Sequence, residues 1–313
     1  MKMTMSQFIK SVLDALGYEI KKKGAVQARS ISTNTNQQCV AANSLLDKGN
    51  TDKCGLKVID KDREFLYELL GAMYLSLHIK PTVIELGVLR GQNANVIRNI
   101  MNPQRMFLID SWSAKEMYAY RKINDKRDWV NDLDYYQEYF GGSLGDQSTF
   151  DRLYTETIDK FNPFSDVEII RASTSEGIAE LNKRGVESAH LIYVDANHQY
   201  ETVLDDLILY KRFLHVDYGC FQLNDCCHSE DGVKQNLGVL EAANKFCKMY
   251  DFIPVAMVNR DFTDVLIAPR RSTFVGLVNN IFNDSNIGFV EIPYHLFPCA
   301  SIRKGARPNV SFL

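Results

Sequence analysis

The sequence lacks three features that would each assign it to a definite class of protein. It has no run approaching the roughly 18 consecutive apolar residues of a membrane span, so we expect no transmembrane segment. Its 36 basic and 39 acidic residues give a net charge of −3, without the basic excess of a nucleic-acid-binding protein. The N-terminal segment has no continuous apolar core and no small-residue cleavage site, so we predict no signal peptide.

The seven cysteines also lack a recognisable pattern. No Cys-x-x-Cys pair is present, which argues against a structural zinc site. Their odd number and scattered positions favour free thiols in a reducing compartment, so we expect a cytoplasmic protein. With 313 residues, 45% of them hydrophobic, the chain is long enough to bury a sizeable core.

The N-terminal segment predicts an amphipathic helix. Apolar residues recur at helical spacing over residues 5–20, and three lysines follow them. The helix is expected either to dock on the protein's own body or on a second copy in a homo-oligomer, or to make weak peripheral contact with a membrane. Few cations flank the apolar stripe, which favours docking. Residues 26–57 are rich in Ser, Thr, Asn and Gln and predict a loop or linker.

From residue 60 onward, predicted helices and strands alternate. The expected strands cover residues 82–86, 106–110, 167–171, 190–194, 218–223, 252–258 and 264–268. This order predicts an α/β fold with a doubly wound, seven-stranded, mostly parallel sheet. Five residues join the last two strands, so the final strand is expected to be antiparallel.

Three segments follow from this pattern: an N-terminal helix and polar linker (1–59), a sheet domain (60–270) and an irregular C-terminal tail (271–313). Residues 111–142 interrupt the sheet domain with Trp, Tyr and charged residues. This composition suits a lid over a polyhydroxylated acceptor, although a dimer contact or a surface helix also explains it. We interpret Asp205 and Asp206 as part of a solvated helix face.

The segment VIELGVLRG has the features of a cofactor-binding turn. Gly87 and Gly91 let the backbone approach a ligand closely, and Asp110, at the end of the next strand, suits the hydroxyls of a ribose. A dinucleotide turn prefers one more glycine to receive a pyrophosphate. The Glu85 carboxylate would repel a pyrophosphate and attract an ammonium or sulfonium group. The pattern therefore favours S-adenosyl methionine over a nicotinamide dinucleotide.

Four motifs follow one another along the chain: ELGVLRG, FLIDSW, YVDANHQYE and LND. Together they resemble class I S-adenosyl methionine-dependent methyltransferases, most closely the metal-dependent O-methyltransferases of macrolide and aminocoumarin sugars. The resemblance covers roughly residues 60–270 and implies a seven-stranded sheet with its last strand antiparallel. It implies cofactor contacts from Glu85, Gly87, Gly91, Asp110, Ser111, Trp112, Ala172 and Ser173. A core or lid position explains Trp112 equally well.

A second group of polar residues is expected at the reacting end. Asp195 ends the fourth predicted strand, and Asn224 and Asp225 end the fifth. Neighbouring parallel strands end at one edge of the sheet, so these side chains should lie close together. Their oxygens suit Mg²⁺, the metal that the resemblance also implies. The alternative is a helix cap at Asp195 and a turn at Asn224–Asp225.

The general base is less certain from the sequence because of one departure. In the sugar methyltransferases that the chain resembles, the fourth strand is followed by Asp-Gly-Asp-His, and the second Asp is assigned the role of base. This chain has Asn197 there, which cannot accept a proton. Either His198 or Asp195 is then expected to take the proton, or metal activation suffices alone, and His228 is a weaker candidate for the base.

The sequence therefore predicts an S-adenosyl methionine- and Mg²⁺-dependent O-methyltransferase. Its acceptor would be a small hydroxylated molecule: a sugar, a glycan precursor or a natural product. Two alternatives stay open. A nicotinamide-dependent oxidoreductase is disfavoured by Glu85 and by the missing glycine, whereas Asn197 keeps open a non-catalytic, methyltransferase-like binding protein.

Overall fold

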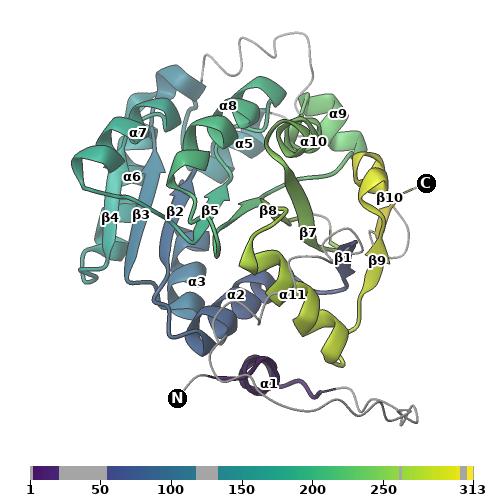
Figure 1. Cartoon of the computed structure of the whole chain (residues 1–313). Coiled ribbons are helices and arrows are strands. Elements are labelled where there is room, and N and C mark those ends of the chain that lie inside the picture. Colours follow the sequence, from purple (N-terminus) through teal and green to yellow (C-terminus); the bar gives the residue numbers. More distant parts are fainter. Residues whose placement is uncertain (1–2, 21–54, 118–132, 261–262, 304–308, 313) are drawn as a thin grey trace, which may run out of the picture.

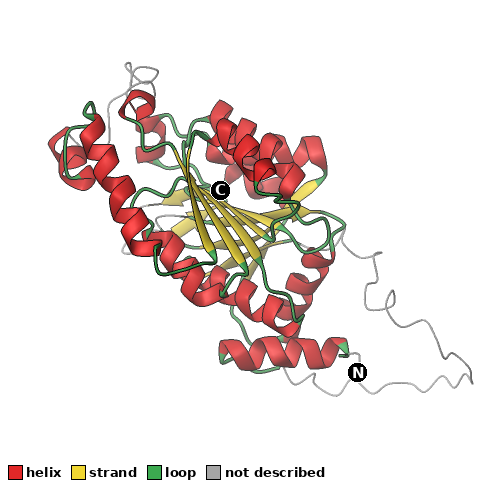
Figure 2. Ribbon diagram, turned by 90° about the vertical axis from the view of Figure 1, so that its left-hand side faces the viewer, coloured by secondary structure: helices red, strands yellow, loops and turns green. Residues whose placement is uncertain are grey.

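The computed structural model describes residues 3–20, 55–117, 133–260, 263–303 and 309–312. A central sheet runs through the molecule with helices on both faces (Figures 1 and 2). Its order is β4-β3-β2-β5-β6-β8-β7-β1-β9, and a separate two-stranded sheet pairs β10 with β11. The strands are β1 (Leu56–Ile59), β2 (Thr82–Leu86), β3 (Arg105–Asp110), β4 (Val167–Arg171), β5 (Leu191–Val194), β6 (Cys220–Leu223), β7 (Phe252–Val258), β8 (Val265–Pro269), β9 (Val290–Ile292), β10 (Ser301–Arg303) and β11 (Asn309–Ser311).

The α-helices connect these strands in the alternating order that the sequence predicts. They are α1 (Met5–Leu16), α2 (Glu64–Ser76), α3 (Gln92–Met101), α5 (Leu133–Phe140), α6 (Gln147–Phe161), α7 (Thr174–Lys183), α8 (Tyr200–Tyr210), α9 (Glu230–Gln235), α10 (Val239–Tyr250) and α11 (Thr273–Asp284). Two short 3₁₀ helices are η2 (Lys211–Phe213) and η3 (Tyr294–Cys299). No helix within the described ranges is long and apolar enough to span a membrane.

The predicted fold class is confirmed, and the strand count is not. β2, β3, β4, β5 and β6 pair in parallel, and β8 runs antiparallel to both β6 and β7. These seven strands correspond to the seven predicted. Two further strands extend the described sheet: β1 pairs in parallel with β7, and β9 pairs antiparallel with β1. β1 overlaps the end of the predicted linker 26–57, most of which falls outside the described residues.

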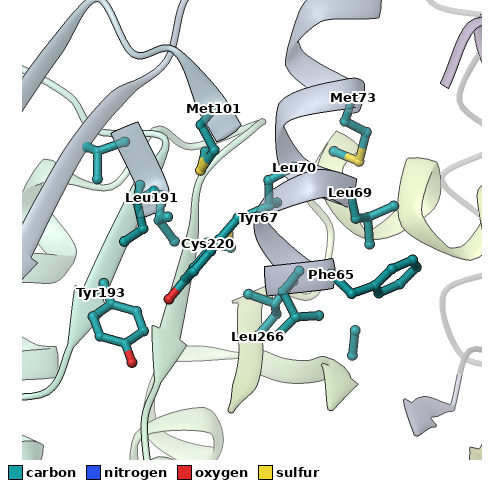
Figure 3. Packing of buried hydrophobic residues seen from close by; sticks show 14 of the residues in the cluster. Phe65, Tyr67, Leu69, Leu70, Met73, Met101, Leu191, Tyr193, Cys220 and Leu266 are labelled. Carbon is teal, nitrogen blue, oxygen red and sulfur yellow. The ribbon is translucent and has the colours of Figure 1, made fainter. Parts of the chain in front are cut away.

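Both faces of the sheet are buried, which explains why its strands have nearly continuous apolar sequences. Val83 and Leu191 face a core shared with α1, α2, α3, α6 and α11, whereas Ile84 and Ile192 face a core shared with α7, α8 and α10. Figure 3 shows the first of these cores, where α2 packs on β5 and β8. The close packing on both faces leaves the strand ends as the place for polar chemistry.

The two terminal segments contribute to this core. In α1, the apolar residues Phe8, Ile9, Val12 and Leu13 are buried, and the helix packs against α2 and α11. The N-terminal helix therefore docks on the protein's own body, the interpretation that the sequence favoured. The described part of 271–313 is not irregular as predicted, because it contains α11, whose buried stripe includes Phe274, Val278 and Ile281. The segment boundaries 1–59, 60–270 and 271–313 stay a prediction.

Two further predictions concern the lid and the acidic residues of α8. The predicted lid, 111–142, lies partly outside the described residues, and α5 falls within it. The interpretation of Asp206 as solvated is wrong, because its side chain is 1% exposed. Asp206 follows Val203 by three residues on α8 and so belongs to the stripe that covers the sheet, while Asp205 is exposed.

Candidate active site

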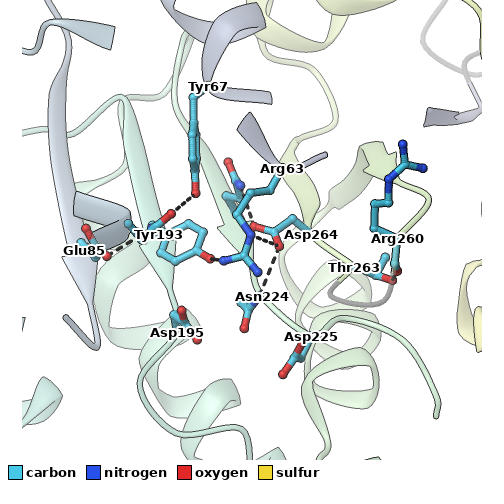
Figure 4. Close-up of polar contacts among 12 residues, drawn as sticks. Arg63, Tyr67, Glu85, Tyr193, Asp195, Asn224, Asp225, Arg260, Thr263 and Asp264 are labelled. Atoms are coloured by element: carbon cyan, nitrogen blue, oxygen red, sulfur yellow. Dashed lines mark hydrogen bonds and ion pairs between the residues drawn. The ribbon is translucent and has the colours of Figure 1, made fainter. Parts of the chain in front are cut away.

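The carboxyl ends of four neighbouring parallel strands bring most of the predicted site residues to one edge of the sheet. Glu85 lies on β2, Asp110 ends β3, Asp195 follows β5 and Asn224 follows β6. Because β8 is antiparallel, its amino end reaches the same edge and brings Asp264 there (Figure 4). The order and direction of the strands thus explain how residues far apart in sequence form one site.

The glycine turn after β2 is tightly folded. Gly87 has φ +84°, and a Cβ there would lie 2.2 Å from the backbone oxygen of Asp195. Gly91 has φ +64° and is the N-cap of α3, and a Cβ there would lie 2.5 Å from the Phe161 ring. Both positions therefore favour glycine, because a Cβ would clash with the Asp195 backbone at one and with the Phe161 ring at the other, and both have a positive φ.

Asp110 holds this turn in place. Its Oδ2 accepts the N–H groups of Val88 and Leu89, each over 2.9 Å, and its Oδ1 accepts the N–H of Trp112 over 2.8 Å. A carboxylate oxygen can accept two hydrogen bonds, so Oδ1 can still accept one from a ligand hydroxyl. Asp110 thus fixes the turn whether or not it also holds a ribose.

The predicted adenosine contacts follow β3 and β4. The Trp112 ring is 1% exposed and its Nε1 donates to the Leu89 carbonyl over 2.8 Å, so the ring belongs to the core. Ser111 precedes it and is partly exposed. The Ala172 N–H donates to the Asp110 carbonyl, and the Ser173 hydroxyl caps α7. The structure brings these residues beside Asp110, and their contact with adenosine stays a prediction.

Glu85 is the most unusual group at this edge. It is 1% exposed, its Oε1 accepts from Asn93 Nδ2 over 3.2 Å, and its Oε2 has no hydrogen-bond partner among the described residues. Tyr67 donates to Asn93 Oδ1 over 2.7 Å and so orients the amide. Burial raises the pKa of Glu85 to about 8 despite the hydrogen bond from Asn93. A positive group beside it would be strongly favoured.

At the reacting end, three polar side chains lie close to His198. Its Nε2 lies 3.3 Å from Asp195 Oδ1, 3.3 Å from Asn224 Oδ1 and 3.8 Å from Asp225 Oδ2. Burial lowers the pKa of His198, but the hydrogen bond to Asp195 and the charge of Asp225 outweigh it and raise the pKa to about 9. Asn197 makes no contact of this kind with His198. Its Oδ1 instead accepts the N–H of Gln199 over 2.8 Å.

The predicted Mg²⁺ ligands come together, but their arrangement does not fit a metal. One oxygen of each of these three residues lies within 3.8 Å of His198 Nε2, so in this arrangement they contact the imidazole and leave no open position between them and the ring. Over the described ranges, no group of three or more His, Cys, Asp or Glu side chains could hold a metal ion. His228 lies apart from this cluster, 3.7 Å from Glu241, and is 43% exposed.

The structure adds residues that the sequence analysis missed. Asp264 is fully buried and accepts from Gln222 Nε2 over 2.7 Å and from Asn224 Nδ2 over 3.2 Å. Arg63, just before α2, lies 3.5 Å from Asp264 Oδ1 and donates to the Tyr193 hydroxyl over 2.8 Å. Asp264 is the first residue of a predicted strand, and this position was a local signal that could have indicated it as a site residue. Arg63 had none, since its hydrogen-bond partner Tyr193 is 130 residues away.

No protein-family model matches the chain, and no curated protein matches it. Three solved structures illustrate what it is similar to. Aeropyrum pernix fibrillarin with natively bound S-adenosyl-L-methionine is 14% identical over 60% of this chain, with a TM-score of 0.39. The ribosomal protein L11 methylase of Lactobacillus delbrueckii subsp. bulgaricus is 13% identical over 68% of this chain and 81% of its own, with a TM-score of 0.40.

The third, the O-methyltransferase of Bacillus cereus in complex with SAH, is 11% identical over 67% of this chain and 82% of its own, with a TM-score of 0.39. This chain spans 66% of the Aeropyrum fibrillarin.

Proposed function

We propose that this protein transfers a methyl group from S-adenosyl methionine to a hydroxyl of a small acceptor, such as a sugar, a glycan precursor or a natural product. The observation that carries the proposal is Glu85, a buried carboxylate whose Oε2 has no partner in the described part of the chain. An ammonium or sulfonium group would stabilise it, whereas the pyrophosphate of a nicotinamide dinucleotide would be repelled.

The residues around Glu85 suit the rest of such a cofactor. Gly87 and Gly91 keep the turn free of side chains, which would let the methionine end approach the backbone. Asp110 Oδ1 can accept a ribose hydroxyl, and Ser111, Ala172 and Ser173 lie at the adjacent strand ends. When bound, S-adenosyl methionine supplies an electrophilic methyl group.

The chain's own residues would then handle the proton of the acceptor hydroxyl. The two oxygens nearest His198 Nε2, from Asp195 and Asn224, can only accept, so Nε2 carries a hydrogen. Because its pKa is about 9, His198 acts as a base only in its neutral fraction, which grows as the pH rises towards 9. In that neutral ring the basic atom is Nδ1, which would take the hydroxyl proton as the oxygen attacks. Asp195 would stabilise the imidazolium that forms.

Mg²⁺ has no step in this proposal, because the imidazole lies among the oxygens that would bind it. We expect neither a chelator nor added Mg²⁺ to change the affinity for S-adenosyl homocysteine. A large gain in affinity with Mg²⁺ would show that His198 moves aside for the metal.

Calorimetry on the full chain tests the cofactor assignment with S-adenosyl methionine, S-adenosyl homocysteine and NAD. We expect the first two to bind and NAD not to bind. Two buffers with different ionisation enthalpies should reveal the release of roughly one proton per ligand at pH 7, because the cationic ligand ionises Glu85. Binding of NAD alone would favour the oxidoreductase, and no binding of S-adenosyl methionine would sink the proposal.

The acceptor is sought by mass spectrometry as a gain of one methyl group. Candidate sugars and natural products are incubated with the protein and S-adenosyl methionine, and an RNA mixture is included as a competing acceptor class. Cofactor binding without transfer to any acceptor would favour the non-catalytic alternative.

A further inference from the structure

The Asn224 side chain lies between two groups that demand opposite ends of its amide. Its Nδ2 donates to Asp264 Oδ1 over 3.2 Å (Figure 4), and its Oδ1 lies 3.3 Å from His198 Nε2. Asn224 is 5% exposed, so water does not compete freely for either end. Turning the amide over would set its oxygen against the carboxylate and its NH₂ against the ring N–H. Asp264 therefore decides which end faces His198.

Asp264 is itself held from three sides. Gln222 donates to its Oδ2 over 2.7 Å, Asn224 donates to its Oδ1, and the Arg63 Nε lies 3.5 Å from Oδ1. Burial raises the pKa of Asp264 to about 6, and the Arg63 guanidinium opposes this rise. Arg63 is in turn anchored on the Tyr193 hydroxyl. The carboxylate is thus supported by β6, by β5 and by the start of α2.

We infer that Arg63 and Asp264 are positioning residues, which hold the Asn224 oxygen against His198 and so keep the hydrogen of the neutral ring on Nε2. Their importance for methyl transfer rests on the proposed function. The hydrogen-bond arrangement itself does not, and it can be tested on the protein without any ligand. Neither residue belongs to the four sequence motifs.

The first test reads the histidine rings by long-range ¹H–¹⁵N correlation spectra of the ligand-free protein near pH 10, above the pKa of about 9 of His198, so that its ring is neutral. In Asp264→Asn we expect the His198 signals to move away from the pattern of a ring protonated on Nε2. Asp251→Asn is the matched control, since Asp251 pairs with Arg270 over 2.8 Å at the surface. Signals of the stacked pair His190 and His215, whose ring centroids lie 4.9 Å apart, report whether each variant is folded.

A double-mutant cycle shows whether the effect passes through Asn224. Asn224→Ala should shift the His198 signals as Asp264→Asn does, and combining the two should produce no further shift. Native His198 signals in folded Asp264→Asn would overturn the inference. Additive shifts in the double variant would also overturn it, because Asp264 would then act on His198 by another route.

The second test uses turnover once an acceptor is identified. Asp264→Asn is expected to lower kcat at least tenfold while the affinity for S-adenosyl homocysteine stays within twofold, and Arg63→Lys should retain more activity than Arg63→Met. An unchanged kcat would overturn the positioning role. Failure of the native protein to bind S-adenosyl homocysteine would instead overturn the proposed function, and the histidine spectra would still decide the hydrogen-bond arrangement.

Discussion

Asn93 donates a single hydrogen bond to Glu85, with 3.2 Å between Nδ2 and Oε1, and the second carboxylate oxygen is buried with no partner among the described residues. An ionised carboxylate in that position is poorly solvated, and this is why burial raises the pKa of Glu85 to about 8. The arrangement weakens the ligand-free protein and favours a cationic ligand. Glu85 therefore favours binding of the cofactor but lowers the stability of the ligand-free protein.

Glu85→Gln should separate these two effects. The native carboxyl has a pKa of about 8, above its ordinary value of 4.5, so stability falls as the pH rises from about 4.5 to about 8. The variant removes this loss and should raise the free energy of unfolding at pH 8 by about 1–3 kcal/mol, with little gain near pH 4.5. It should also weaken binding of S-adenosyl methionine by roughly 10–100-fold.

Urea unfolding at the two pH values and calorimetry measure both effects. Glu68→Gln is the control, because Glu68 is exposed on α2 and should change neither quantity. Lower stability of Glu85→Gln at pH 8, or unchanged cofactor affinity, would contradict the role assigned to Glu85.

Gly87→Ala tests the close approach of the turn to β5. A Cβ at this position would meet the Asp195 carbonyl oxygen at 2.2 Å, in a backbone with φ +84°. We expect a loss of roughly 2–4 kcal/mol in stability, about 1 of it from the positive φ and the rest from overpacking, and loss of cofactor binding. In Gly185→Ala, with φ +65° and no atom within 4 Å, the φ strain of about 1 kcal/mol should remain alone. Equal losses in the two variants would refute the close approach.

The alternating strands could be predicted because each carries its own local signal. Val83 and Ile84 face opposite cores, so a continuous apolar run marks a strand buried on both sides. β1 carries no such signal, since it is short and contains Lys57. That lysine is 1% exposed and is tolerated there because it pairs with Glu291 on β9, 234 residues away. Only the folded sheet makes the lysine compatible with a core strand.

The same distinction separates the predicted from the missed parts of the site. We could predict Asp195, Asn224 and Asp225 because each follows a strand that its own local sequence indicates. Mg²⁺ was predicted from their oxygens alone, whereas in the fold one oxygen of each lies within 3.8 Å of His198 Nε2. Arg63 reaches the site only through tertiary packing, so no local pattern indicated it.

Asp206 gives a test of buried charge away from the site. Its Oδ2 has no partner among the described residues, and burial raises its pKa to about 7, with a hydrogen bond from Thr174 opposing the rise. Stability should therefore fall as the pH rises from about 4 to about 7, and Asp206→Asn should recover about 1–3 kcal/mol at pH 8. Thermal unfolding at pH 4.5 and pH 8 measures the change. The exposed neighbour provides the control, Asp205→Asn, and a similar gain there would show that burial is not the cause.

The choice of base is tested by replacing the two candidate histidines. His198→Gln should lower kcat by roughly 10²–10⁴-fold and leave the affinity for S-adenosyl homocysteine unchanged, because the ring acts on the acceptor proton. His228→Gln should retain full activity, since His228 lies at the surface beside Glu241. Equal losses in the two variants would rule out a specific role for His198.

Asn197→Asp then asks whether an acid at the position used by the sugar methyltransferases can replace His198. The Asn197 Oδ1 accepts the Gln199 N–H over 2.8 Å, so a carboxylate there would keep this hydrogen bond at the start of α8. We therefore expect Asn197→Asp to restore no turnover in the His198→Gln background. Methylated product measured by mass spectrometry checks this. Recovery of more than tenfold would show that residue 197 can reach the acceptor, and the base would then be assigned by that position.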